Sequence, residues 1–354
     1  MRALVLAGGS GTRLRPFSYS MPKQLIPIAN TPVLVHVLRS IRELGVSEAG
    51  VVVGNRGPEI EAVLGDGSRF DLRITYIPQD APLGLAHTVS IARDFLGDDD
   101  FVMYLGDNML PDGVADIAGE FTMHRPDAQV VVHQVADPRS FGVAELGPDG
   151  EVLRLVEKPA EPRSDLALLG VYFFTPAIHR AVAAIKPSAR GELEITDAVQ
   201  WLLTSGADVR ASRYDGYWKD TGRAEDVLEC NSHFLGGLRG RVDGDVDPGS
   251  ILLGQVVVEA GARVLRSRIE GPTIIGAGTV VEDSQVGPYT SIGRDCLVSG
   301  SRLERSIVLN QATVTGVHSL RDSLIGRGAS VGTTGSGAGH CLVVGDHTRV
   351  EVAA

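Results

Sequence analysis

About the first 235 residues alternate between two patterns of hydrophobic and polar positions. Short runs of aliphatic and β-branched residues predict strands, whereas the longer amphipathic stretches 32–44 and 86–95 predict helices. The predicted strands are 3–6, 49–53, 72–76, 101–105 and 129–133. This alternation indicates an α/β fold with a mostly parallel sheet and helices on both faces. In such folds ligands bind beyond the carboxyl ends of the strands.

A second pattern begins near residue 250, after a stretch rich in glycine, aspartate and proline. From there apolar residues recur every 17 positions, and within each repeat they lie about six residues apart. The three registers are Leu252, Ile269, Val286, Leu303 and Leu320; Val258, Ile275, Ile292 and Leu309; and Val264, Val281 and Val298. This hexapeptide repeat predicts a parallel β-helix with three short strands per turn. We therefore expect an α/β domain at 1–237, a linker at 238–249 and a β-helix at 250–354.

Charge and cysteine content narrow the function classes. Acidic residues outnumber basic ones, 44 to 33, so the net charge of −11 disfavours nucleic acids and anionic membranes as partners. Cys230, Cys296 and Cys341 show neither disulfide nor zinc spacing, which is typical of a reducing compartment. The apolar N-terminal run is too short for a signal peptide, and no stretch reaches the ~20 apolar residues of a membrane span. We expect a cytoplasmic protein.

The first predicted strand leads into a glycine-rich loop, GGSGTRLRP at 8–16. Backbone N–H groups of such a loop can approach a phosphate closely. Neither common phosphate motif fits, because Leu14 stands where a dinucleotide fingerprint needs glycine and Thr12-Arg13 stands where a Walker A motif needs Gly-Lys. Two cations, Arg13 and Lys23, accompany the loop, and they suit a triphosphate whose leaving group gathers negative charge. An ordinary turn with two exposed basic residues is the alternative.

Other residues that could carry chemistry lie further along the chain. Asp107 comes just after 101–105, where a metal-binding carboxylate or a simple turn would both fit. Lys158 lies between Glu157 and a proline, as a phosphate ligand or an exposed surface pair would. Gln79 offers a donor and an acceptor, which reading a pyrimidine edge requires, but a solvated turn residue would also fit. No set of residues for nucleophilic catalysis by serine or cysteine is apparent.

These segments, taken in order, resemble the sugar-1-phosphate nucleotidylyltransferases. The matching motifs are LAGGSGTRLRP at 6–16, PKQLIP at 22–27, PQ at 78–79, GLA at 84–86, LGDN at 105–108, FGV at 141–143, EKP at 157–159, GVY at 170–172, RGELEITD at 190–197 and WKDTG at 218–222. Lys-Gln-Leu at 23–25 and the β-helix are most similar to the long-form glucose-1-phosphate thymidylyltransferases. The resemblance implies a Rossmann-like nucleotide-diphospho-sugar transferase fold followed by a left-handed β-helix. It also implies Mg²⁺-dependent transfer of a thymidylyl group from dTTP to glucose 1-phosphate. We expect a homo-oligomer for a different reason, because self-association is one way to cover the exposed faces and open end of a β-helix.

The resemblance further implies a role for each matching residue. Catalysis would fall to Arg13, Lys23, Lys158 and Asp107. Nucleotide binding would fall to Leu6, Gly8, Gly9, Gly11, Thr12, Gln79, Pro82, Gly84 and Asp107. Sugar-phosphate binding would fall to Phe141, Gly142, Glu157, Lys158, Val171, Arg190 and Glu194. The metal would be held by Asp107 and Asp220.

Other functions stay open at this point. A uridylyltransferase differs only by the thymine methyl group, whose burial is worth roughly 1 kcal/mol, and other nucleotides are weaker candidates. An additional acyltransferase activity of the β-helix would need a histidine base, for which His318, His340 and His347 are candidates. A non-catalytic regulatory paralogue should have lost charged ligands, which are present here. Phe141 replaces a tyrosine of many short-form members, so the details of sugar contact in those enzymes are not transferred. The short-form members also lack the β-helix, so their assembly and feedback site are not transferred either.

Overall fold

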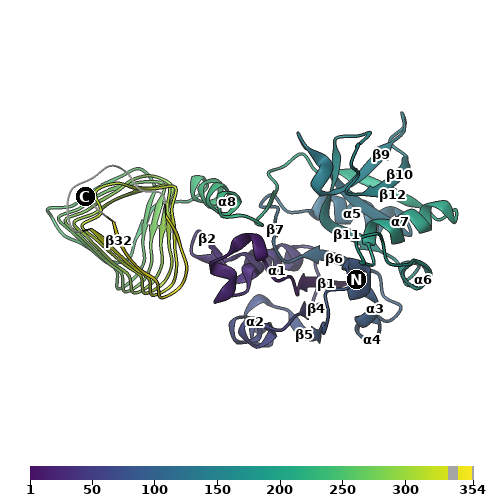
Figure 1. Ribbon diagram of the computed structural model, residues 1–354, viewed down its shortest axis with the longest axis horizontal. Helices are drawn as coiled ribbons and strands as arrows, with labels where there is room; N and C mark the ends of the chain where they lie inside the picture. Colours follow the sequence, from purple (N-terminus) through teal and green to yellow (C-terminus); the bar gives the residue numbers. More distant parts are fainter. Residues whose placement is uncertain (334–341, 353–354) are drawn as a thin grey trace. The chain divides into compact units, whose positions relative to one another are not determined.

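The computed structural model describes residues 1–333 and 342–352 (Figure 1). Contacts between residues divide the chain into two compact units. We call residues 1–9 and 34–218 the α/β unit, and residues 10–33 and 219–354 the β-helix unit. The predicted boundaries at 237 and 250 follow the sequence pattern rather than these contacts, and they stay predictions.

A mixed sheet forms the centre of the α/β unit. Its main path has the order β10-β9-β11-β6-β1-β4-β5, and β8 joins β11 to β12. Strands β6, β1, β4 and β5 are parallel, whereas β11 is antiparallel to β6, β8 and β9. The bounds are β1 (Arg2–Ala7), β4 (Glu48–Val53), β5 (Arg73–Pro78), β6 (Phe101–Leu105), β8 (Ala128–Gln134), β9 (Gly142–Leu146), β10 (Val152–Glu157), β11 (Leu166–Phe174) and β12 (Val209–Arg213). The five predicted strands are confirmed to within two residues at each end.

The helices of this unit connect the strands and cover the sheet. They are α1 (Val33–Glu43), α2 (Gly57–Leu64), α3 (Leu85–Ile91), α4 (Arg93–Leu96), α5 (Ala115–His124), α6 (Ile178–Ala184) and α7 (Ile195–Thr204), with 3-10 turns η4 (Ser68–Phe70) and η5 (Pro138–Ser140) and the short strand β7 (Asn108–Met109). The helix predicted at 32–44 is confirmed as α1. The helix predicted at 86–95 is divided at Ala92 into α3 and α4. No helix in the described part of the chain has the length and hydropathy that a membrane span requires.

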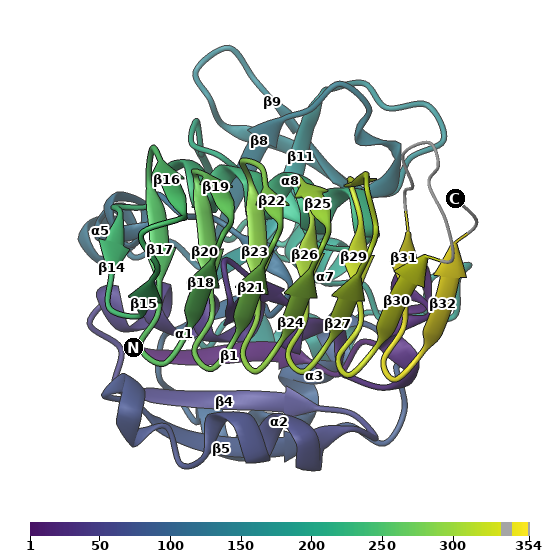
Figure 2. The ribbon, with the colours of Figure 1, turned by 90° about the vertical axis from the view of Figure 1, so that its left-hand side faces the viewer.

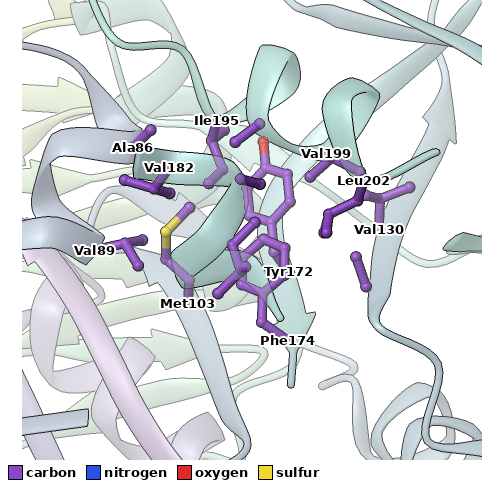
Figure 3. Close-up of a cluster of buried hydrophobic side chains, with 14 of the residues drawn as sticks. Ala86, Val89, Met103, Val130, Tyr172, Phe174, Val182, Ile195, Val199 and Leu202 are labelled. Atoms are coloured by element: carbon purple, nitrogen blue, oxygen red, sulfur yellow. The ribbon is translucent and has the colours of Figure 1, made fainter. Parts of the chain in front are cut away.

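A hydrophobic cluster between the sheet and its helices holds the strands in place (Figure 3). Met103 of β6 and Tyr172 and Phe174 of β11 lie at its centre, where the rings of the last two stack at 5.9 Å. Val199 and Leu202 of α7 close one side. Because such interiors are closely packed, the segments that follow β6 and precede α7 have little freedom to move.

The β-helix unit carries the repeat (Figure 2). The described residues form three parallel sheets, consistent with the predicted left-handed β-helix. The first contains β14 (Arg241–Val242), β17 (Val256–Val258), β20 (Thr273–Ile275), β23 (Thr290–Ile292), β26 (Ile307–Val308), β29 (Leu324–Ile325) and β31 (Val343–Val344). The second contains β15 (Asp245–Val246), β18 (Arg263–Leu265), β21 (Val280–Glu282), β24 (Leu297–Ser299), β27 (Thr313–Thr315), β30 (Ser330–Thr333) and β32 (Arg349–Val352). The third contains β16 (Ile251–Leu253), β19 (Arg268–Glu270), β22 (Gln285–Val286), β25 (Arg302–Glu304) and β28 (Leu320–Arg321).

Two of the predicted registers are confirmed and one needs a correction. The pairs from Leu252 to Leu320 and from Val264 to Val298 follow the step of 17. In the remaining register Ile292 pairs with Val308, not with the predicted Leu309. The turn that follows Leu303 is one residue shorter than in earlier coils, so the inward position arrives one residue early.

The β-helix unit also contains the rest of the glycine-rich loop and a helix. The loop segment has the 3-10 turns η1 (Thr12–Leu14), η2 (Phe17–Tyr19) and η3 (Lys23–Leu25), followed by a hairpin of β2 (Pro27–Ile28) and β3 (Thr31–Pro32). Strand β13 (Lys219–Asp220) and helix α8 (Ala224–Gly236) lead into the first coil. In Figure 1, α8 lies beside the β-helix.

Candidate active site

The glycine-rich loop starts directly after β1, and its first residues belong to the α/β unit. A Cβ atom at Gly8 would lie 2.7 Å from Oε1 of Gln79. Gln79 follows β5, and its Nε2 lies 3.4 Å from Nδ1 of His87. Glycine at position 8 therefore lets the Gln79 amide lie against the loop. Of the other predicted residues here, Leu6 lies in β1 and Gly9 lies in the loop.

Pro82 and Gly84 belong to a turn before α3. Gly84 has a φ of 107°, which side chains rarely adopt, and a Cβ there would collide with the backbone of Leu193. Leu193 donates its N–H to Leu83 O (2.8 Å) and accepts a hydrogen bond from Ala86 N (2.9 Å). Pro82 is exposed. These backbone bonds fix the turn, and glycine is the residue that fits at position 84.

Asp107 lies two residues beyond β6 and is 8% exposed. Nδ2 of Asn108 donates to Oδ1 of Asp107 (3.2 Å), and Oδ1 of Asn108 accepts from Nε1 of Trp218 (2.7 Å). The ring of Trp218 also meets that of Phe141 edge-on, at a centroid distance of 5.3 Å. Asn108 and Trp218 were not predicted as site residues, yet they hold the Asp107 carboxylate and the Phe141 ring in place.

The predicted sugar-phosphate residues form a charged cluster. Oε1 of Glu157 lies 3.4 Å from Nζ of Lys158 and 3.2 Å from Nη1 of Arg190. Arg190 also lies 3.4 Å from Oε1 of Glu194. The backbone N–H of Lys158 donates to Phe141 O (3.0 Å), which brings the predicted aromatic residue to the same place. The structure thus brings Phe141, Glu157, Lys158, Arg190 and Glu194 together.

Hydroxyl groups that the sequence analysis missed complete this cluster. Thr196 Oγ1 donates to Oε2 of Glu157 (2.7 Å), and Ser188 Oγ donates to Oε1 of Glu194 (2.9 Å). Burial raises the pKa of Glu194 against the lowering effect of the Ser188 hydroxyl. Burial and the charge of Glu157 also raise the pKa of Asp197. Thr196 and Asp197 lie within the matching motif at 190–197, which was the available signal.

Gly142 and Val171 contribute backbone and packing. A Cβ at Gly142 would lie 2.8 Å from both Leu168 Cδ1 and Thr196 Oγ1, so the close approach of β9 to α7 depends on this glycine. Val171 is fully buried in β11, where it pairs with Tyr104 of β6. Its role at a sugar stays a prediction.

The β-helix unit holds a second group of predicted residues. Nη2 of Arg13 lies 3.5 Å from Oδ2 of Asp220, and a Cβ at Gly222 would lie 2.8 Å from the same Nη2. Gly11 has a φ of 62°, and a Cβ there would lie 3.0 Å from Cβ of Lys23. Gly11 therefore lies close to Lys23, and Arg13 lies close to Asp220 and Gly222.

Asp107 belongs to the α/β unit and Asp220 to the β-helix unit. Both offer carboxylate oxygens, the donors that Mg²⁺ prefers. Among the described residues no group of three or more His, Cys, Asp or Glu side chains gathers where it could hold a metal ion. Mg²⁺ usually takes only one or two carboxylates from a protein and its other ligands from water and substrate phosphates, so the chemistry of each side chain suits this ion.

His318, His340 and His347 are the candidates for the base of an additional acyltransferase activity. His318 and His347 are exposed, and His340 lies outside the described residues. Cys230 and Cys296 are buried and form no disulfide, whereas Cys341 also lies outside the described residues.

Comparison with known proteins shows which family the chain resembles. The sequence profile of the family described as Nucleotidyl transferase matches residues 2–236. A glucose-1-phosphate thymidylyltransferase of Streptomyces griseus is 56% identical over 354 residues, and one of Streptomyces antibioticus is 52% identical over 354 residues. Each alignment covers 99% of this chain and 99% of the relative. A crystal structure of a Bacillus anthracis protein, provisionally named a glucose-1-phosphate thymidylyltransferase, is 32% identical, with a TM-score of 0.62, and covers 66% of this chain and 94% of that one.

The chain therefore belongs to the Nucleotidyl transferase family. Its likeness to the two Streptomyces thymidylyltransferases includes the β-helix, because the alignments run nearly from end to end.

Proposed function

We propose that the protein transfers the thymidylyl group of dTTP to glucose 1-phosphate, forming dTDP-glucose and pyrophosphate. The observation that carries this proposal is 56% identity, over 99% of both chains, to a glucose-1-phosphate thymidylyltransferase. The charged cluster supports it, since Lys158 and Arg190 supply cations for a sugar phosphate. Glu157 and Glu194 supply carboxylates that accept hydrogen bonds from sugar hydroxyls.

The reaction needs alignment and charge compensation more than proton transfer. The phosphate of glucose 1-phosphate is already an anion at neutral pH, so no general base is required. Its oxygen attacks the α-phosphorus of dTTP in line, the bond from that phosphorus to the bridging oxygen breaks, and pyrophosphate leaves with the electron pair. Lys158 holds the attacking phosphate, while Arg13 and Lys23 stabilise the charge that collects on the leaving group.

We propose Mg²⁺ as the cofactor, with Asp107 and Asp220 as its protein ligands. When bound, the ion would neutralise phosphate charge during the transfer. The Asn108–Trp218 contacts keep Asp107 oriented for this role, and the Arg13 guanidinium keeps Asp220 paired.

We propose that Gln79 reads the pyrimidine edge and that Gly8, Gly9, Gly11, Thr12 and Gly84 let the nucleotide approach the backbone. A uridylyltransferase remains the second candidate, because one methyl group of about 0.8 kcal/mol separates the two bases. We therefore expect kcat/KM with UTP to differ from kcat/KM with dTTP by only a few fold.

The test is Mg²⁺-dependent pyrophosphate release from glucose 1-phosphate with dTTP, UTP, GTP, CTP and ATP in parallel. Asp107→Asn should abolish release, whereas Asp116→Asn on exposed α5 should leave it unchanged. Turnover with dTTP supports the proposal, and release with none of the nucleotides would overturn it. Acetyl-CoA consumption would indicate the acyltransferase activity, and nucleotide binding without turnover would indicate the regulatory paralogue.

We also propose that the protein is cytoplasmic and forms a homo-oligomer. Light scattering on the purified full chain measures the assembly.

A further inference from the structure

One outer face of the β-helix is covered by other parts of its own unit. In the first sheet, Val256 and Val258 point into the β-helix core, whereas Val257 between them belongs to a separate cluster with Ile274 of the next coil. Leu235 of α8 completes this cluster, and Leu238 and Ala29 pack against it. Outward residues of the second and third sheets, such as those of β18 and β19, are exposed instead. The outer face of the first sheet is therefore where α8 and the hairpin of β2 and β3 pack.

Asn231 of α8 lies in this contact and is 0% exposed. Its Oδ1 accepts two hydrogen bonds, from Ser291 Oγ in β23 (2.7 Å) and from the backbone N–H of Ala29 in the hairpin (2.9 Å). Its Nδ2 donates to Tyr289 O (3.4 Å). Next to it, Nδ2 of Asn30 donates to Ile292 O (2.7 Å). One buried amide thus joins the β-helix, α8 and the hairpin tip.

The hairpin tip has an unfavourable backbone conformation, which its hydrogen bond to Asn231 stabilises. Ile28 pairs with Thr31 across the turn, and the two residues between them have φ values of 47° for Ala29 and 60° for Asn30. A turn with two left-handed residues favours glycine or asparagine, and alanine is disfavoured there. The bond from Ala29 N–H to Asn231 holds this residue in its strained geometry.

A short series of backbone hydrogen bonds connects the hairpin tip to Lys23, one of the two cations proposed to stabilise the triphosphate. Lys23 opens η3, which ends two residues before β2. Ile26 N–H donates to Lys23 O (3.2 Å), and Val33 N–H after the hairpin donates to Ile26 O (3.1 Å). The Lys23 stem in turn packs against Gly11 of the phosphate loop. A shift of the tip would therefore move Lys23 and the loop.

We propose that Asn231 is a positioning residue for nucleotide binding: it ties the hairpin to the β-helix and so sets the place of Lys23 and the glycine-rich loop. The β-helix thereby takes part in binding the nucleotide without touching it. This inference rests on the proposed function for the identity of the nucleotide. Binding of the sugar phosphate, which the charged cluster of the α/β unit would hold, should not depend on Asn231 and serves as the control.

The experiment compares Asn231→Leu, Asn231→Asp and Ser232→Ala in the full chain. Asp keeps the acceptor oxygens for Ala29 and Ser291, and Ser232 is the neighbouring residue whose hydroxyl bonds within α8. Calorimetric titration with dTTP and Mg²⁺ gives Kd, and steady-state kinetics give KM for each substrate. We expect N231L to weaken dTTP binding about tenfold, which corresponds to about 1.4 kcal/mol, while KM for glucose 1-phosphate stays unchanged. N231D keeps the acceptor but places a carboxylate beside Tyr289 O in a buried site, so it should recover only part of the loss, and S232A should match the wild type.

A second variant covers the case in which N231L does not fold. Asn30→Gly removes the bond to Ile292 but keeps a residue suited to positive φ, so the turn can still form. It should weaken dTTP binding several fold with no change for the sugar phosphate. Equal effects on both substrates, or unchanged dTTP binding in folded N231L or N30G, would overturn the inference. A wild type that binds dTTP but shows no turnover would contradict the proposed function alone.

Discussion

The hydroxyl of Thr196 donates a 2.7 Å hydrogen bond to Oε2 of Glu157, although 39 positions separate the two residues. The other oxygen of the same carboxylate faces Lys158 and Arg190. Thr196 opens α7 and is 1% exposed, so its bond orients Glu157 from the buried side. The carboxylate therefore has a fixed plane before any sugar arrives.

Replacing Thr196 with valine should release that orientation while keeping the shape of the side chain. A hydrogen bond to a charged group is worth about 1.5–3 kcal/mol, so we expect KM for glucose 1-phosphate to rise about tenfold or more. KM for dTTP should not change. Thr204→Val, at the exposed end of the same helix, is the matched control. Steady-state kinetics with each substrate varied in turn make the measurement, and equal changes in both KM values would contradict the assignment.

The raised pKa of Glu194 predicts a pH effect on stability. Because burial raises the pKa in the folded state, the native protein binds this proton more readily than the unfolded chain does. The resulting contribution to stability is fully present below the ordinary pKa of glutamate and is lost as the pH rises through the raised value. Glu194→Gln lacks this titration. The free energy of unfolding of the wild type, measured in urea and compared with that of E194Q, should therefore increase as the pH falls from 7 to 4. A difference that does not vary with pH would contradict the prediction.

Gly84→Ala should damage the nucleotide side of the site. The new Cβ would collide with the backbone of Leu193, and the φ of 107° is costly for alanine. We expect a loss of at least ~2 kcal/mol in unfolding free energy or a folded protein with greatly weakened dTTP binding. Gly119→Ala is the control, because it lies within exposed α5 with open space around it, and it should stabilise the protein by about 0.5–1 kcal/mol. Thermal unfolding with and without dTTP distinguishes the outcomes.

A ladder of serines at one corner of the β-helix gives a prediction for stability. Ser284 Oγ donates to Glu282 O (2.6 Å) and accepts from Ser301 N–H (3.0 Å), and Ser284 N–H donates to Ser267 Oγ (3.1 Å). Ser284→Ala leaves the buried Ser301 N–H without this acceptor, which costs about 1–3 kcal/mol. Ser299→Ala, half-exposed on the outside of a neighbouring coil, should cost less than ~0.5 kcal/mol. Equal effects of the two substitutions in chemical denaturation would contradict a role for the ladder.

The inward-pointing residues of the β-helix were predictable because each one stacks on the equivalent residue of the next coil. That rule places Leu252 on Ile269 and Val264 on Val281 directly from the spacing. It failed at 309, since Val308 and Leu309 are both apolar and only the length of the preceding turn decides which one points inward. A periodic pattern carries no information about a single shortened turn.

The candidate site was predictable where a motif fixes residue type and order, as for Asp107, Glu157 and Lys158. Residues that act by supporting these side chains gave a weaker signal. Thr196 and Trp218 stood inside recognised motifs, but their spacing could not reveal which distant carboxylate or amide they contact. Asn231 gave no signal at all, because its partners Ala29 and Ser291 are brought to it only by the tertiary fold.

The bond from Asn30 to Ile292 has a consequence for the order of folding during synthesis. The two residues are 262 positions apart, and a ribosome adding about 5–20 residues per second needs roughly 13–50 s to span that distance. Throughout that interval the hairpin has left the ribosome while its docking coil does not yet exist. A segment translated among the first thus reaches its native contacts among the last. If Asn231 and this docking position Lys23 as proposed, a nascent chain acquires its full nucleotide affinity only after the coil that contains β23 has formed.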